Sequence, residues 1–211
     1  MKKIILFCLM GCLLTSIFTG CGKKTSDPTP YIKAIYNLYI LGDTEVAKEL
    51  GLSTDHIIAA EEAYNEALAQ NLRDNFAAGG ITVNDTDILA IITARSTAMS
   101  RMEAGYICTM ESKTSATVTI LASYFDEIAL DTSAAKDAVA TAEDKTFESK
   151  EDYMAFVTAT YVENLIAAYQ SVSPSVEKKE ISVPCVLTDG IWYPKNMEQF
   201  YSDLATTICG Q

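Results

Sequence analysis

Histidine is almost absent from this sequence of 211 residues, which contains only His56. A protein zinc site needs several His or Cys ligands at close spacing, and neither C-x-x-C nor H-x-x-x-H occurs. A histidine-based catalytic triad could use only His56, which we expect on the surface of a helix. Glycine-rich phosphate loops are missing too, because Gly79-Gly80 is an isolated pair typical of a helix end. We therefore predict no catalytic residues, no metal site and no cofactor.

Basic residues are also scarce. The chain has 16 Lys and Arg against 28 Asp and Glu, a net charge of −12. Removal of residues 1–20, with Lys2 and Lys3, would take the basic residues from 16 to 14 and the net charge to near −14. Nucleic acid binding needs a basic surface, so nucleic acid is excluded as a partner. An acidic surface is typical of a soluble exported domain, and it would not adhere to an anionic membrane without a lipid.

Two acidic clusters could carry chemistry. The run 84–87, Asn-Asp-Thr-Asp, lacks the Gly and the distal Glu of a calcium loop, so we interpret it as a helix cap. Asp126 and Glu127, with Asp131 nearby, could form a carboxylate pair for acid–base catalysis. The alternative is a solvated helix start, which we prefer because nothing in the sequence brings the two carboxylates together.

The first residues have the parts of an export signal: Lys2 and Lys3, an apolar run from Ile4 to Leu14, and small residues before Cys21. A bilayer span takes about 20 apolar residues, so this run is too short to cross a membrane comfortably. The motif Phe18-Thr19-Gly20-Cys21 resembles the bacterial lipobox, although Phe18 replaces the usual Leu. An ordinary secretory signal and a retained membrane anchor are the alternatives.

The lipobox implies that Cys21 becomes the acylated N-terminus, with fatty acids such as palmitate on it. Two acyl chains give stable anchoring where one is marginal. We therefore predict a signal peptide at 1–20, an acylated Cys and tether at 21–30, and a single domain at 31–211. The predicted location is the extracytoplasmic face of the cell membrane, with the lipid on Cys21 holding the protein there.

Three cysteines lie beyond Cys21: Cys108, Cys185 and Cys209. An odd number cannot all pair. One disulfide among them is compatible with an extracytoplasmic location, and buried free thiols are the other possibility.

Apolar residues recur at helical spacing in several segments, the first being Tyr31 to Leu41. Four polar residues stand where helix N-caps belong: Ser53, Asn84 (or Asp85), Ser149 and Asn196. The segment 126–143 is Ala-rich with a weak pattern, which 131–133 could interrupt.

The pattern alternates in 105–124 and again in 180–194, which predicts two antiparallel hairpins. Asp189-Gly190 is typical of a two-residue hairpin turn, which would place Leu187 opposite Trp192 and Cys185 opposite Pro194. Pro184 has no N–H, so we expect its strand to be an edge strand or bulged. The predicted fold is α+β: a small antiparallel sheet of two hairpins with about five or six helices packed mainly on one face.

Tyrosine is plentiful, with 11 residues, and it combines an apolar ring with a polar tip that suits a binding cleft. We name Tyr106, Tyr124, Trp192 and Tyr193 as candidate binding residues. The alternative is that these rings only fill the core.

Three segments carry a resemblance to a known family. They are 31–52, with Gly-Asp and Ala-Lys-Glu-Leu-Gly; 116–126, with Ala-Thr-Val-Thr and Tyr-Phe-Asp; and 189–200, with Asp-Gly-Ile-Trp-Tyr-Pro and Met-Glu-Gln-Phe. Together they resemble an uncharacterised family of Gram-positive (Firmicutes-type) extracytoplasmic lipoproteins of unknown function. The resemblance implies an envelope lipoprotein and supplies no catalytic residues.

We therefore expect a membrane-anchored lipoprotein of the cell envelope that is a non-catalytic module and binds a small molecule or an envelope protein. One alternative is a structural or accessory lipoprotein with protein partners only. Another is an enzyme of unrecognised type that uses carboxylates such as Asp126 and Glu127.

Overall fold

The computed structural model describes residues 25–211, so the predicted signal peptide, Cys21 and the first part of the tether lie outside the described residues. Within 25–211 the chain forms seven α-helices, one π-helix and four strands. In order they are α1 (Thr29–Tyr36), η1 (Asn37–Leu41), α2 (Glu45–Glu49), α3 (Thr54–Ala78), α4 (Asp85–Met99), β1 (Ala104–Met110), β2 (Ser115–Ala122), α5 (Glu127–Glu143), α6 (Lys150–Ser171), β3 (Lys179–Thr188), β4 (Ile191–Pro194) and α7 (Met197–Ile208).

The four strands form one antiparallel sheet in the order β1-β2-β3-β4. The turn at Asp189-Gly190 has positive φ at both residues, 53° and 82°, as a type I′ turn requires. The predicted register is confirmed, because Leu187 pairs with Trp192 and Cys185 pairs with Pro194. The α+β fold class is confirmed as well.

The prediction for Pro184 was wrong in one respect, because β3 is a central strand that pairs with both β2 and β4. Lys195 N–H donates to the Pro184 carbonyl at 2.7 Å, so this residue directs its backbone polar groups toward the β4 side. Cys185 pairs with Pro194, the last residue of β4, so Pro184 lies opposite Lys195, one residue beyond the end of that strand. No residue within β4 therefore requires an N–H donor from Pro184. The central strand therefore loses no ladder hydrogen bond there.

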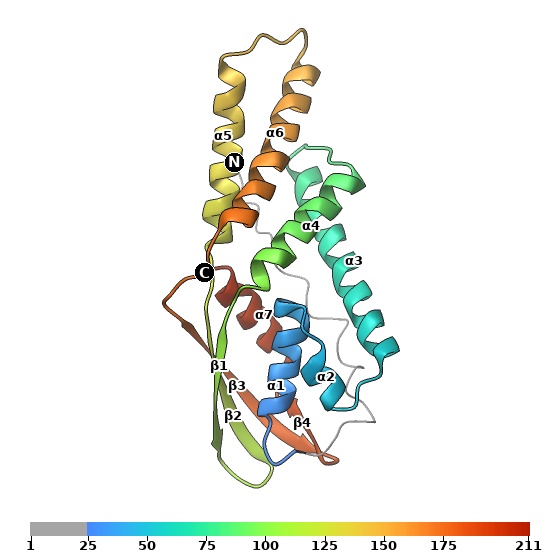
Figure 1. Cartoon of the computed structure of the whole chain (residues 1–211), viewed down its shortest axis with the longest axis vertical. Helices are drawn as coiled ribbons and strands as arrows, with labels where there is room; N and C mark the ends of the chain where they lie inside the picture. The colour runs from blue at the N-terminus through green and yellow to red at the C-terminus, as the bar shows by residue number, and fades with distance from the viewer. Residues whose placement is uncertain (1–24) are drawn as a thin grey trace.

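Helices cover one face of the sheet (Figure 1). On that face β2 and β3 bury Val118, Ile120, Ile181 and Val183, and α1 and α7 pack against the strands. The other face is partly open, with Ile107 and Ser182 exposed. Alternating burial is what a strand period of two produces when one face is solvated.

The predicted N-caps are confirmed. Ser53, Asn84, Ser149 and Asn196 each accept a hydrogen bond from a backbone N–H in the first turn of the following helix. α5 is continuous from Glu127 to Glu143, so the residues 131–133, which could have interrupted it, do not. Ala134 and Ala138 are buried and the Tyr161 hydroxyl of α6 donates to Asp131, so packing on α6 holds this weakly patterned helix.

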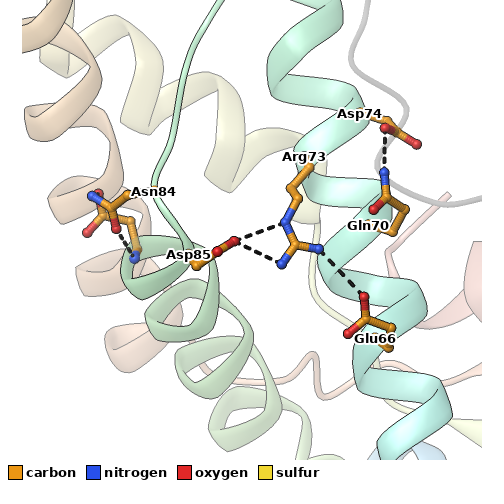
Figure 2. A network of polar contacts seen from close by, with 7 residues as sticks. Glu66, Gln70, Arg73, Asp74, Asn84 and Asp85 are labelled. Carbon is orange, nitrogen blue, oxygen red and sulfur yellow. Dashed lines mark hydrogen bonds and ion pairs between the residues drawn. The ribbon is translucent and has the colours of Figure 1, made fainter.

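Two helical pairs complete the structure. The α5–α6 hairpin extends away from the sheet at the opposite end of the molecule from the β1–β2 turn (Figure 1). In the α3–α4 pair, Arg73 of α3 donates to Asp85 at the start of α4 at 2.9 Å and lies 3.8 Å from Glu66 (Figure 2). The Arg73–Asp85 contact joins the two helices near their connection. The first half of α3 and the second half of α4, farther from this connection, line a cavity.

Candidate functional site

A cavity of about 290 Å³ lies between η1, α3 and α4. It is lined by Leu38, Tyr39 and Ile40 of η1 and by Gly42, which follows η1; by Glu61, Tyr64 and Asn65 of α3; and by Arg95, Ser96 and Met99 of α4. The lining combines apolar side chains with a few polar groups, which is the usual composition of a small-molecule site.

The π-helix η1 forms one wall of this cavity. The single helix expected over Tyr31 to Leu41 is instead α1 followed by η1, in which the Gly42 N–H donates to the Asn37 carbonyl five positions back. The Asn37 amide also donates to Asp43 at 2.8 Å, and Gly42 ends the segment at φ 67°. Short π-helical turns are rare and occur frequently at functional sites.

Two tyrosines meet at the cavity. The rings of Tyr39 and Tyr64 lie 5.4 Å apart between centroids in a tilted arrangement. The Tyr39 hydroxyl is buried and has no hydrogen-bond partner among residues 25–211. Burial raises the pKa of Tyr39 well above its ordinary value, and the nearby Tyr201, Tyr64 and Glu61 add to the shift. Burial also raises the pKa of Tyr64, while the adjacent Arg95 guanidinium opposes that shift.

Arg95 lines the cavity and is part of a buried ion pair behind it. Its Nε lies 2.8 Å from Oε1 of Glu127, and each side chain is only 4% exposed. Burial is the largest influence and disfavours the charged form of Arg95, but the Glu127 carboxylate together with Tyr64, Cys209 and Tyr169 outweighs burial, so the pKa of the guanidinium is raised. The Cys209 thiol donates to the second carboxylate oxygen of Glu127 at 3.3 Å. This cluster joins α4, the start of α5 and the end of α7.

Glu61 is the other charged residue in the lining. It is half-buried on α3 and forms no ion pair or hydrogen bond with any residue in the described range. Tyr64 and Asn65 follow it at positions i+3 and i+4, so the three side chains share one face of the helix. The carboxylate of Glu61 therefore stands beside two aromatic rings without a cationic partner from the described fold.

The candidate residues Tyr106, Tyr124, Trp192 and Tyr193 lie elsewhere, and none of them lines this cavity. Tyr106 is on β1, edge-on to Tyr36 at 6.3 Å between centroids, and Trp192 is on β4, 2% exposed. β1 and β4 are the opposite edge strands of the sheet, so these two do not form one site.

Tyr193 is half-buried on the other face of β4, where it pairs with Val186. Tyr124 follows β2 and lies under the Lys179 ammonium, 4.7 Å from the ring centroid. The four residues are thus separated, and their role in binding stays a prediction.

The other expected reactive groups have structural contacts. Asp126 caps α5 by accepting the Ala129 N–H, and Glu127 pairs with Arg95. His56 is exposed, as expected. Cys108, Cys185 and Cys209 are free thiols. Residues 25–211 contain no group of three or more His, Cys, Asp or Glu placed to hold a metal ion. No helix in the same range is long and apolar enough to cross a membrane.

Sequence reasoning missed both Arg95 and the burial of Glu127. The signal for Arg95 is in α4, where it continues the apolar stripe of Ile88, Ile91 and Ile92 at helical spacing. A lone charge on a buried helix face indicates a buried partner. The sequence gives no indication of which carboxylate that partner is.

No protein-family model matches this sequence, and no curated protein matches it significantly. Among solved structures, the fold is similar to the crystal structure of a putative lipoprotein (ycdA) from Bacillus subtilis subsp. subtilis str. 168, with a TM-score of 0.62 and 14% sequence identity. The similarity covers 87% of this chain and 56% of that one, so this chain spans just over half the length of its structural neighbour. At this identity the comparison shows a shared fold alone.

Proposed function

We propose that this protein is a lipid-anchored lipoprotein of the extracytoplasmic cell envelope whose domain binds a small molecule in the cavity between η1, α3 and α4. The observation that carries the binding function is the cavity itself, whose lining contains two tyrosines and a half-buried carboxylate without a partner among residues 25–211. The export signal and the lipobox-like Cys21 support the anchor. The Bacillus subtilis neighbour with a similar fold, which is named a putative lipoprotein, agrees with this proposal.

We propose binding rather than catalysis as the role of the domain. Asp126 holds the first turn of α5, and Glu127 is paired with Arg95 and accepts from Cys209. A general acid or base must reach the substrate proton, and both carboxylates make other contacts instead.

Native mass spectrometry of the chain from residue 22 onward, compared with the denatured mass, tests the binding function. A mass excess that disappears on denaturation is expected and gives the mass of the ligand. A matched pair of variants locates the site: Ser96→Trp fills the cavity from an exposed position on α4, and Thr97→Trp places the same ring outside it. Loss of the excess mass in both variants, or in neither, contradicts a site in this cavity.

A second candidate function is attachment of a protein partner through the α5–α6 hairpin. The observation in its favour is that this hairpin extends away from the sheet (Figure 1), with Val139 exposed on α5. Chemical cross-linking in cells from Glu148→Cys, in the α5–α6 connection, tests it. Recovery of a specific partner from this position, and not from Lys113→Cys in the β1–β2 turn, would favour the second function.

A further inference from the structure

The cavity lining contains two charged residues, and only one of them lacks a counterion within the described fold. Arg95 is compensated by Glu127 at 2.8 Å. Glu61, on α3, lines the same cavity without an ion pair or a hydrogen bond in residues 25–211. The cavity with its buried ion pair therefore has a net charge of about −1 from these groups, and a cationic ligand would compensate it.

The groups around Glu61 suit an ammonium ion. Tyr39 and Tyr64, whose ring centroids are 5.4 Å apart, line the same cavity as Glu61, and Tyr64 stands one helical turn after Glu61 on α3. Aromatic faces attract ammonium groups through the ring quadrupole, and a carboxylate supplies the opposite full charge. An ammonium that carries N–H donors could also hydrogen-bond to Glu61.

The backbone of the opposite wall contributes in the same direction. α1 and η1 form one continuous helical segment that ends at Leu41, and Gly42 follows it in the cavity lining. The last carbonyls of a helical segment have no partner within it, and this end carries the negative part of the macrodipole. Helix end and Glu61 therefore both favour positive charge in the same space.

An anionic ligand is disfavoured by the same geometry. The Arg95 side chain is 4% exposed and its charge is already balanced, so little of it faces the cavity. A carboxylate or phosphate would come close to Glu61 with no free cation from the described residues to offset the repulsion. The net charge of −12 further lowers the local concentration of anions and raises that of cations.

The size and the remaining lining limit the ligand. A volume of about 290 Å³ is at the lower end of small-molecule pockets. Leu38, Ile40 and Met99 give it an apolar part. We infer that the cavity binds a small organic ammonium compound, with its charged group between Glu61, Tyr39 and Tyr64 and a short apolar body against Leu38, Ile40 and Met99. This inference rests on the proposed function, because it assigns the ligand class of the same cavity.

Isothermal titration calorimetry of the full chain in detergent tests the charge requirement with matched probes. Choline is compared with 3,3-dimethylbutan-1-ol, its neutral isostere, and butylammonium is compared with butyrate. We expect at least one ammonium probe to bind at millimolar concentration or below and its neutral or anionic counterpart to bind at least about tenfold more weakly. Equal binding of the two members of each pair overturns the inference, as does the failure of both ammonium probes to bind.

Two variants test the position of the charged group. Glu61→Gln keeps the shape of the side chain and removes its charge, and Glu62→Gln makes the same charge change at the exposed next position, outside the cavity lining. We expect Glu61→Gln to weaken ammonium binding by about tenfold or more and Glu62→Gln to change it less than about twofold. Equal effects of the two variants overturn the assignment of Glu61. Circular dichroism melting of both variants shows whether they remain folded.

The two proposals can fail separately. A neutral or anionic ligand that native mass spectrometry finds, and that Ser96→Trp removes, would refute the ammonium inference and leave the binding function intact. Ammonium binding that is insensitive to both Glu61→Gln and Ser96→Trp would refute the cavity as the site.

Discussion

Arg95 and Glu127 are 32 positions apart in the chain and meet at 2.8 Å inside the protein, each with a side chain only 4% exposed. The contact connects the middle of α4 to the first residue of α5, and the thiol of Cys209 at the end of α7 donates to the same carboxylate. Three separate segments of the chain are therefore joined through one buried charge pair. Because Glu127 neutralises the charge of Arg95, the negative charge of Glu61 is the charge in the cavity lining that a ligand can compensate.

The first prediction concerns this pair. Arg95→Met should lower the free energy of unfolding by about 3–5 kcal/mol, because it leaves the Glu127 carboxylate buried without its counterion. Urea denaturation followed by circular dichroism measures it. The control is Lys178→Met, which breaks the exposed pair with Glu103 and should cost about 0–1 kcal/mol. Arg95→Met combined with Glu127→Leu should cost less than the sum of the single changes, and additivity of the two would contradict the pairing.

Much of the fold could be predicted from local signals. The caps at Ser53, Asn84, Ser149 and Asn196 were predicted because a side chain that satisfies an orphan N–H acts within one turn. The register of β3 and β4 follows from the two residues of the turn at Asp189-Gly190 and is equally local.

The features that make the site depend on distant contacts. The pairing of Arg95 with Glu127 depends on how α4 and α5 pack, and the local sequence of Glu127 resembles an ordinary acidic helix start. The π-helix differs from an α-helix by one residue in its turn, and the apolar spacing of 31–41 fits both. The candidate tyrosines and Trp192 were chosen by residue type, and residue type alone does not show which rings share a cavity.

The second prediction concerns the end of η1. Gly42 has φ 67° and no atom within 4 Å of an added Cβ, so its conformation rather than lack of space requires glycine. Gly42→Ala should lower the free energy of unfolding by about 1–2 kcal/mol. Gly105→Ala is the control, because this residue lies in β1 with no positive φ and should lose at most about 0.5 kcal/mol. Equal losses in urea denaturation would show that the left-handed turn is not the cause.

The third prediction is a pH dependence. Burial raises the pKa of the Cys185 thiol from 9.0 to about 12. Between pH 9 and 12 the unfolded chain therefore loses this proton while the folded chain keeps it, so the stabilisation present below pH 9 is lost as the pH rises. Burial also raises the pKa of Tyr36 and Tyr201 above 10.0, which adds to the loss above pH 10.

Urea denaturation at several pH values measures this dependence. The free energy of unfolding should fall as the pH rises above 9, and Cys185→Ala should make the fall shallower between pH 9 and 10, where this thiol ionises in the unfolded chain. A slope that Cys185→Ala leaves unchanged in that interval would contradict the assignment to this thiol.

The fourth prediction ranks the reactivity of the thiols. Cys108 is half-buried, whereas Cys185 and Cys209 are buried. Burial raises the pKa of Cys209 well above its usual value, and Glu127 raises it further, so its thiol stays protonated and inaccessible. In the folded protein, a thiol reagent at pH 8 should modify Cys108 well before the other two, and urea should remove the difference. Rapid modification of Cys209 in the folded state, located by peptide mass spectrometry, would contradict its burial against Glu127.

The last prediction joins the proposed lipid anchor to the orientation of the domain. The described chain begins at the sheet end of the molecule, close to the β1–β2 turn (Figure 1), and α1, which starts at Thr29, packs against β1. Cys21 precedes Thr25 by four positions, which span at most about 14 Å when extended. An acylated Cys21 therefore places the β1–β2 turn near the membrane and the connection between α5 and α6 far from it.

Fluorophores on Lys113→Cys and Glu148→Cys report the two ends of the molecule, in a Cys108→Ser background where the other described thiols are buried. In proteoliposomes with spin-labelled lipid, the label at 113 should be quenched more strongly than the label at 148, because quenching requires contact with the bilayer. Cys21→Ala should abolish the quenching of both labels and release the protein from the membrane fraction, since a chain without its acyl groups loses the anchor. Stronger quenching at 148 would reverse the proposed orientation, and unchanged membrane fractionation of mature Cys21→Ala protein would refute the lipid anchor.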